Sequence, residues 1–316
     1  MRLTAFAVVL AALTPLTWAD ATLRYHMDVQ LANGTALALP AYQELTDNRD
    51  MVIRIKGNKT YADANHLVLI TDLKTRDLST VDAMNKRYAT VPAGQYADQA
   101  KIAIPAIPEQ ARAMLAAMKT NVESHSTGRT ATIQGIEAEE REIVMTVDLP
   151  MPGVPTNGGP LVKMVMQVWS PKPEEVERVE ALHELKTYMA SAASALNPAE
   201  MVKQLAAIIP GFGDSISGMI SDMTKDGAIT LRTHMEIMMP LLASMTRQMP
   251  RQAGQAPPTD IDPNAPVMQM TQELVELSSN PVDEAIFQIP ADYQSVPLEE
   301  ILKGAASTPT PPQFKH

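Results

Sequence analysis

Residues 21–34, ATLRYHMDVQLANG, alternate between apolar and polar side chains more cleanly than any other stretch of the chain. Every second residue from Leu23 to Leu31 is apolar, and the residues between them are mostly polar. Such a two-residue period puts the apolar side chains on one side of an extended backbone. Asn33-Gly34 then supplies a turn signal. The pattern therefore predicts a half-buried β-strand in a sheet with one apolar and one polar face.

Shorter strands of the same kind follow, separated by turn signals such as Gly57-Asn58. Consecutive strands joined by short turns usually pair with their neighbours, so this region predicts an antiparallel meander. The expected strands of the meander are 51–56, 60–64, 66–73, 78–81 and 86–91. Later strands are expected at 130–133, 137–149, 161–169, 228–238 and 266–278.

Helical periods interrupt the strands in two places. Pro108 marks one helix start, with Met114, Leu115, Met118 and Val122 on one face. Further helices are expected at 174–193, 198–209 and 215–223. A two-faced sheet needs its apolar face covered, and inserted helices can cover it. The sequence thus predicts an α+β fold, a curved antiparallel sheet (an incomplete barrel) of about nine to eleven strands wrapped over several helices.

The N-terminus predicts export. Met1-Arg2 gives a positive start, residues 3–13 are apolar, and small residues favour cleavage near Ala19 or Ala21. We expect a signal peptide at 1–19 and a periplasmic mature chain without a transmembrane segment, because no stretch of about 20 apolar residues is present. The expected single domain spans 20–303, with a helical insertion at about 174–225, a Pro-rich loop at 250–266 and a disordered tail at 304–316.

Composition excludes several classes of function. There is no cysteine, which excludes a disulfide, a thiolate nucleophile, a cysteine-ligated metal and acylation at an N-terminal cysteine. The net charge of −10 argues against nucleic acid as a partner, because neutralising phosphates needs a basic face. The same charge argues against attraction to anionic lipid head groups.

Motifs for catalysis or cofactors are not found. None of the six histidines belongs to a His-Glu-x-x-His motif, and we expect His26 and His234 on the polar faces of their strands. No Gly-x-Ser-x-Gly elbow is present. The glycines of 211–218 lack the Gly-Lys-Ser/Thr ending of a phosphate loop. The acidic residues of 137–142 and 174–180 are expected on solvated faces. The sequence therefore predicts no enzyme, no cofactor and no metal.

Methionine is in excess, with 21 residues against 4 phenylalanines and 2 tryptophans. Methionine is flexible and polarizable, so it suits a pocket for ligands of variable shape, but it also fills irregular cores. A third interpretation makes the thioethers Cu(I) ligands. If a pocket exists, the candidates to line it are the apolar strand positions Tyr25, Met27, Val29, Met164, Met166, Val168, Leu231, Met235 and Met268.

Several blocks resemble a family. DMVIRIKGNKTYADAN, LVLITDLKTRDLSTVDAMNKRYATV, TATIQGIEAEEREIVMTV and FQIPADYQSV resemble bacterial exported proteins of a domain family of unknown function. That group is similar to the periplasmic lipoprotein carriers and their outer-membrane receptors of the lipoprotein-localisation type. The resemblance covers most of 22–169 and 267–297, and it implies an incomplete barrel closed by helices over an apolar cavity for acyl chains.

The leading hypothesis is accordingly a non-catalytic periplasmic protein that binds a lipid, acyl chain or other hydrophobic small molecule in a Met-rich cavity. The alternative is a structural module with a filled core that binds an envelope protein, through the acidic helix 174–193 and the Pro-rich loop. An enzyme, such as a hydrolase, is the third hypothesis.

Overall fold

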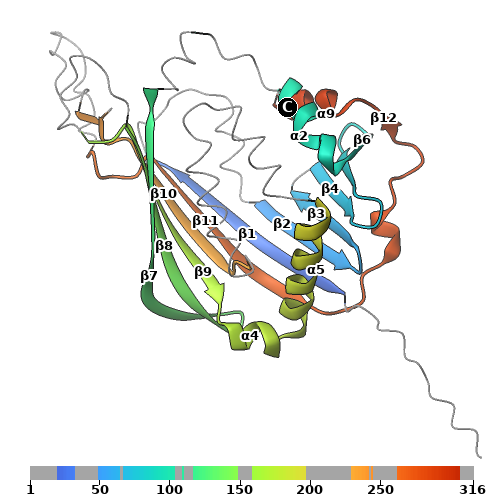
Figure 1. The fold of residues 1–316 in the computed structure, drawn as a ribbon, viewed down its shortest axis with the longest axis horizontal. Coiled ribbons are helices and arrows are strands. Elements are labelled where there is room, and N and C mark those ends of the chain that lie inside the picture. The colour runs from blue at the N-terminus through green and yellow to red at the C-terminus, as the bar shows by residue number, and fades with distance from the viewer. Residues whose placement is uncertain are drawn as a thin grey trace, which may run out of the picture.

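The computed structural model describes residues 20–32, 49–64, 67–103, 109, 117–148, 159–196, 229–241, 243–244 and 262–306. These residues form a mixed α+β fold that contains one large, open sheet of 12 strands and four α-helices. Figure 1 shows a strongly curved sheet, with α5 lying across it.

The sheet joins strands from the whole length of the chain. Its spatial order is β12-β6-β5-β4-β3-β2-β1-β11-β10-β9-β8-β7. All neighbours are antiparallel except β12 and β6. In chain order the strands are β1 (Ala21–Leu31), β2 (Arg49–Lys56), β3 (Lys59–Ala64), β4 (Leu67–Asp72), β5 (Asp77–Asp82), β6 (Arg87–Pro92), β7 (Lys119–Ile133), β8 (Ile136–Asp148), β9 (Val162–Pro171), β10 (Arg232–Met238), β11 (Met268–Ser278) and β12 (Gln294–Ser295).

The register defines two faces. Directly opposite residues of paired strands point to the same side of a sheet. Leu23 on β1 lies opposite Ile53 on β2 and Leu277 on β11. We call the side that carries Leu23 the inner face and the other side the outer face. The apolar residues of the alternating pattern in β1 therefore lie on the inner face, and the polar residues between them lie on the outer face.

The first hydrophobic core lies on the inner face, under α4 (Pro173–Arg178) and α5 (Glu180–Leu196). Leu23, Leu182 and Leu231 are completely buried in it. Each side chain of this size stabilises the fold by about 1.5–3 kcal/mol when it is fully buried. The helices therefore close this part of the sheet with a solid apolar layer.

A second core covers the inner face of β5 and β6. It is formed with α2 (Ala93–Ala103) and α9 (Leu298–Ala306), which also contact each other. Its buried members are Leu78, Ala89, Val91, Ala93, Leu298 and Ile301.

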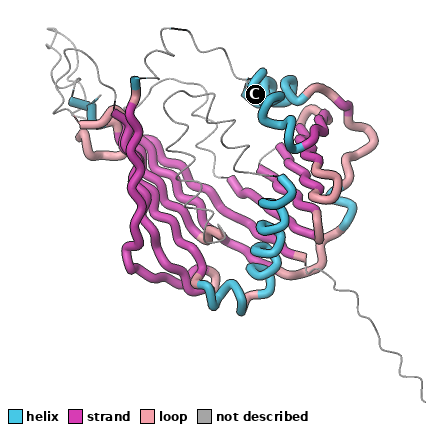
Figure 2. Tube along the Cα trace, in the orientation of Figure 1, coloured by secondary structure: helices cyan, strands magenta, loops and turns pink. Residues whose placement is uncertain are grey.

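The C-terminal segment wraps around the β6 edge of the sheet. Before it reaches α9, the chain crosses the outer face, where Val282 and Phe287 pack against Val68, Ile70 and Val81. Phe287 ends a short 3₁₀ turn, η2 (Glu284–Phe287), and β12 then pairs with β6. Figure 2 shows this loop passing from β11 around the side of the sheet to the helices.

Asp20 links the start of β1 to this C-terminal segment. The Asp20 carboxylate is 9% exposed and accepts hydrogen bonds from Val282 N at 2.5 Å and Lys56 Nζ at 2.9 Å. Lys56 Nζ also donates to Val282 O at 2.6 Å. Three segments of the chain therefore meet at one buried carboxylate.

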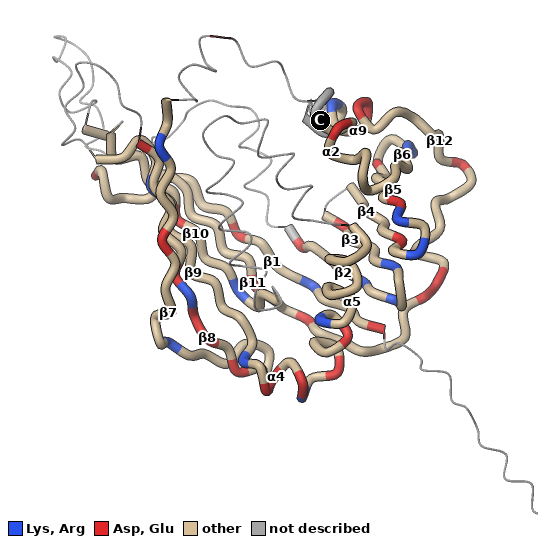
Figure 3. Tube along the Cα trace, in the orientation of Figure 1, with Lys and Arg blue, Asp and Glu red and all other residues tan. Residues whose placement is uncertain are grey.

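The outer face of the central strands is polar. Arg232 donates two hydrogen bonds of 2.9 Å to Glu273 on the next strand, and Arg24 pairs with Glu276. Basic and acidic residues lie interspersed along these strands in Figure 3. No helix among the described residues is long and apolar enough to cross a membrane.

The structure corrects the predicted elements in several places. The sheet has 12 strands rather than nine to eleven, and Val122, expected in a helix, lies on β7 opposite Met145. β7 is an edge strand with mostly exposed side chains, so its pairing with β8 rather than an apolar period determines its conformation.

The helices also differ from expectation. The helix expected at 174–193 is divided by the extended residue Val179 into α4 and α5. α9 continues to Ala306, three residues into the expected tail. The expected helices at 198–209 and 215–223, and most of the loop at 250–266, lie outside the described residues.

Arg87 on β6 forms an ion pair with a buried carboxylate on β5. Arg87 Nη2 donates to Asp82 Oδ2 at 2.9 Å, and Asp82 is 3% exposed. Burial alone would raise the pKa of Asp82, but the hydrogen bonds donated by Arg87 and Asn85 hold this pKa below its ordinary value.

Candidate functional site

Two apolar rows cross the inner face from β1 to β8. Neighbouring members of each row are directly opposite residues of paired strands, so the side chains stand beside one another. At about 4.8 Å per strand, each row is about 19 Å long. We call these two rows the methionine face. The first row is Val29, Met270, Met235, Met166 and Ile143, and the second is Leu31, Met268, Ile237, Met164 and Met145.

The methionine face is partly covered. Ile143, Met166 and Val168 are buried and form a small cluster, with Met164 and Met235 partly buried against it. Met268 and Met270 are half-buried, and Leu31 at one end is 37% exposed. This cluster contains no residue of the four described helices. The methionine face is therefore covered unevenly, with Ile143 only 2% exposed at its β8 end.

A mixed row borders the methionine face. It lies two residues further along each strand, toward the α5 end of β1. Thr233 lies opposite both Gln272 and Val168, and Val168 lies opposite Arg141 on β8. Thr233 and Gln272 are half-buried, whereas Arg141 is exposed. Since Met27 on β1 lies opposite Gln272, this row mixes apolar and hydrogen-bonding side chains.

All nine predicted residues lie on the inner face, but in different surroundings. Met164, Met166, Val168 and Met235 belong to the small cluster, and Met27, Val29 and Met268 lie on neighbouring positions of β1 and β11. Tyr25 and Leu231, in contrast, belong to the core under α5.

Tyr25 lies in the hydrophobic core under α5. Its hydroxyl donates to Thr230 O at 2.9 Å, and the side chain is largely enclosed by the core. Burial raises the pKa of Tyr25 to about 12. Tyr25 therefore stays neutral at physiological pH and helps to fix the end of the apolar rows.

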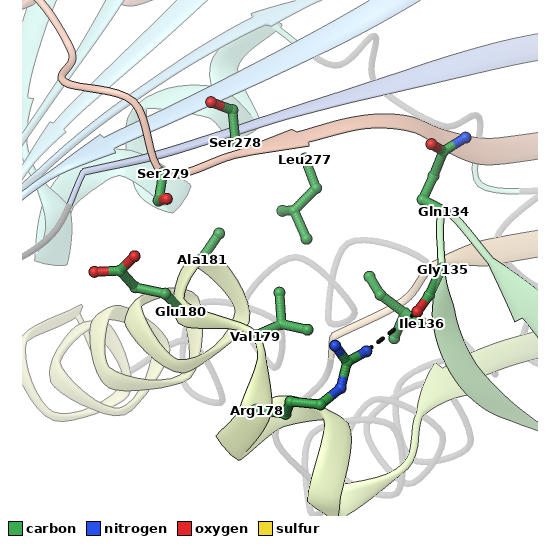
Figure 4. Close-up of a pocket in the computed structure, with 10 residues that line it drawn as sticks. All are labelled: Gln134, Gly135, Ile136, Arg178, Val179, Glu180, Ala181, Leu277, Ser278 and Ser279. Carbon is green, nitrogen blue, oxygen red and sulfur yellow. Dashed lines mark hydrogen bonds between the residues drawn. The ribbon is translucent and has the colours of Figure 1, made fainter.

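The described pocket lies elsewhere. Its volume is about 250 Å³, and it opens between the β7–β8 turn, the α4–α5 junction and the end of β11 (Figure 4). Arg178 crosses it to donate to Gly135 O at 3.1 Å. None of the nine predicted residues lines this pocket. Its lining residues are Gln134, Gly135, Ile136, Arg178, Val179, Glu180, Ala181, Leu277, Ser278 and Ser279.

The histidines that we expect on polar faces lie on the outer face. His26 Nδ1 is 2.9 Å from Asp50 Oδ1, and His234 Nδ1 is 2.9 Å from Thr271 Oγ1. Within the described ranges no group of three or more His, Asp or Glu side chains could hold a metal ion.

Two acidic residues contradict the expectation of solvated faces. Glu140 is 1% exposed and accepts a 2.6 Å hydrogen bond from Thr127 Oγ1 while pairing with Arg129. Glu175 is 8% exposed and pairs with Arg178. The sequence conceals this burial, because Glu140 stands between the exposed residues Glu139 and Arg141 on β8 and Glu175 follows the exposed Glu174 on α4.

The nine residues predicted from the sequence do not include every residue of the methionine face. Met145 and Met270 belong to the methionine face, and the alternation of their strands is visible in the sequence. The half-buried pair Thr233 and Gln272 carries no such signal, because it exists only once β10 and β11 are paired.

Neither a comparison with protein-family models nor a search of the curated proteins found a match to this chain. The resemblance to the lipoprotein carriers therefore stays a prediction.

Proposed function

We propose that this chain is a non-catalytic binding protein that holds an acyl chain or another elongated hydrophobic ligand against the methionine face. The observation that carries the proposal is that six of the ten residues in its two rows are methionines. Thioether side chains are unbranched, so they adjust to ligands of different shape without a large loss of packing.

Exposure supports the same function. A face meant only to complete the core would be covered by branched aliphatic residues, as under α5, where Leu182 and Leu231 are completely inaccessible. Here Met235, Met268 and Met270 keep part of their surface exposed. Each methylene that a ligand buries on such a surface contributes about 0.8 kcal/mol.

The proposal extends to location and family. The apolar N-terminal stretch and the absence of cysteine fit an exported periplasmic protein. The open, curved sheet with helices on its inner face fits the incomplete barrel of the lipoprotein carriers. The ligand class implied by that resemblance, an acyl chain, is the one that the methionine face suits chemically.

The test starts with protein purified from a bacterial periplasm without detergent. Native mass spectrometry followed by organic extraction should show a bound fatty acid or phospholipid. After delipidation, a fluorescent fatty acid should bind, and Met235→Gln should weaken its affinity about tenfold by placing an amide in the first row. The matched control is Glu236→Gln, an isosteric change on the outer face of the same strand, which should leave the affinity unchanged.

An apo mass together with no probe binding would contradict the proposal. The alternative of a filled core with a protein partner would then be the one to pursue. Equal effects of the two variants would show that the probe binds somewhere other than the methionine face.

A further inference from the structure

The pocket between the β7–β8 turn and the α4–α5 junction has no part in the proposed function, because no residue of the methionine face lines it. We propose that this pocket is a second binding site, which takes a small carboxylic acid with a short apolar body and binds its carboxylate through Arg178. The inference does not rest on the proposed function, and each can fail without the other.

The centre of the pocket is apolar. Figure 4 shows the side chains of Ile136, Val179 and Leu277 pointing toward one another across it, with Ala181 beside them. Ile136 and Ala181 are 2% and 3% exposed, so the core under α5 holds this part of the lining in place. Ligand pockets usually have volumes of about 300–1,000 Å³. A volume of about 250 Å³ therefore suits a small molecule rather than a long acyl chain.

The guanidinium of Arg178 is held at the edge of this apolar centre. Its Nε donates to Glu175 Oε1 at 3.0 Å, and its Nη2 donates to Gly135 O at 3.1 Å. Glu175, which is 8% exposed, also accepts a hydrogen bond of 3.3 Å from Glu137 N. The β7–β8 hairpin and α4 are therefore joined around this ion pair. A group that is already ordered loses little conformational freedom when it binds a ligand.

Part of the Arg178 fork is still available to a ligand. The hydrogen bonds of Arg178 engage Nε and Nη2, and within the described ranges none engages Nη1. In Figure 4 the dashed line joins one terminal nitrogen to Gly135, and the other terminal nitrogen points into the pocket. A guanidinium has five donors in a planar fork, so it can bind a ligand oxygen while it keeps both of its partners. A ligand whose apolar body fills the centre can therefore place its carboxylate on Nη1.

The charges of the rim favour a single negative charge on the ligand. Gln134 and Ser279 are neutral and exposed, and their side chains make no hydrogen bond within the described part of the chain. The other charged group is Glu180, and Figure 4 shows its carboxylate across the pocket from Arg178. Because Arg178 already has Glu175 as a partner, a phosphate dianion would be repelled by the two glutamates. A monocarboxylate adds less charge and still gains a charge-assisted hydrogen bond.

The test compares three probes that share a fluorinated ring: 4-fluorobenzoate, 4-fluorobenzyl alcohol and 4-fluorobenzylamine. Fluorine NMR titration of delipidated full-length protein should show about tenfold tighter binding of the acid than of the alcohol or the amine, since charge-assisted hydrogen bonds are about twice as strong as neutral ones. Arg178→Lys keeps a cation beside Glu175 but removes the planar fork, so it should remove most of this preference. Glu180→Gln should strengthen binding of the acid, because it removes a negative charge from the rim.

Ser279→Phe is the second variant, because it fills the pocket from an exposed position and leaves Arg178 with its partners. It should weaken the binding of all three probes. Two controls should leave the affinity for the acid unchanged. Arg232→Ala removes an arginine that is paired with Glu273 on the outer face, and Met235→Gln changes the methionine face.

Equal affinities for the three probes, or tightest binding of the amine, would overturn the inference. So would a preference for the acid that survives both Arg178→Lys and Ser279→Phe, or one that only Met235→Gln removes. If a fatty acid binds the methionine face and 4-fluorobenzoate does not bind, this inference alone fails, and the reverse result contradicts the proposed function alone. Circular dichroism shows whether each variant is folded, and Ser279→Phe decides if Arg178→Lys is not.

Discussion

β1 passes through two regions of the inner face that differ in how they are packed. At one end Leu23 is completely buried under α5, and at the other end Leu31 is 37% exposed beside the methionines. The first region uses branched and aromatic residues that fit one arrangement, whereas the second uses unbranched thioethers that fit many. One face of a sheet can therefore provide both a rigid support and an adaptable surface.

The largest expected effect separates the regions by stability. Leu182→Ala should lower the free energy of unfolding by about 3 kcal/mol, because it leaves a cavity in the rigid core. Met235→Ala should cost less than half as much, since Met235 is only partly buried. Denaturant titration of the two variants measures both values. A larger loss of unfolding free energy for Met235→Ala than for Leu182→Ala would contradict the difference between the two regions.

The next effect concerns alkaline pH. Tyr25 has a pKa of about 12 in the folded protein against 10.0 ordinarily, so its neutral form is favoured by folding. This contribution is complete below pH 10 and is lost as the pH rises from 10 to 12, by about 2–3 kcal/mol. Tyr25→Phe should flatten the pH dependence in this window. Burial also raises the pKa of Tyr188, so the prediction concerns the difference in pH dependence between the wild type and Tyr25→Phe. An identical loss of stability with pH in the two proteins would contradict the prediction.

The smallest effect sharpens the comparison within the adaptable region. Met235→Leu together with Met270→Leu should change stability by less than about 1.5 kcal/mol for each substitution, because volume and polarity are nearly conserved. Leucine is stiffer, however, so the affinity for a bent, cis-unsaturated fatty acid should fall relative to the straight saturated one. Competition titrations with the two acids measure the ratio. An unchanged ratio would mean that thioether flexibility is not what the face provides.

Local patterns in the sequence predict much of the fold. The alternation of 21–31 places β1 and its inner residues correctly, and Gly57, which has a positive φ of 55°, marks the β2–β3 turn. Only the end of β7, at 130–133, is predicted, and its longer first part is missed because an edge position demands no apolar period. The break at Val179 is missed because α4 and α5 together keep a helical composition.

The site is less predictable, for a physical reason. That Met164, Met166, Met235 and Met268 fall on apolar strand faces follows from alternation alone. Which of them stand side by side depends on the pairing of β10 with β9 and β11, and no local signal specifies a register between segments so far apart.

The pairing of β1 with β11 has a consequence for how the chain folds. Arg24 and Glu276 face each other although 252 positions separate them, whereas β1 to β6 and β7 to β9 pair with strands close in sequence. Contacts between segments so far apart in the sequence form late and slowly, because closing the loop between them costs conformational entropy before the contacts stabilise the chain. We therefore expect the two parts of the sheet to form first and to be joined only when β11 pairs with β1. A chain cut before Met268 would leave the backbone edge of β1 unpaired and available to strands of other chains.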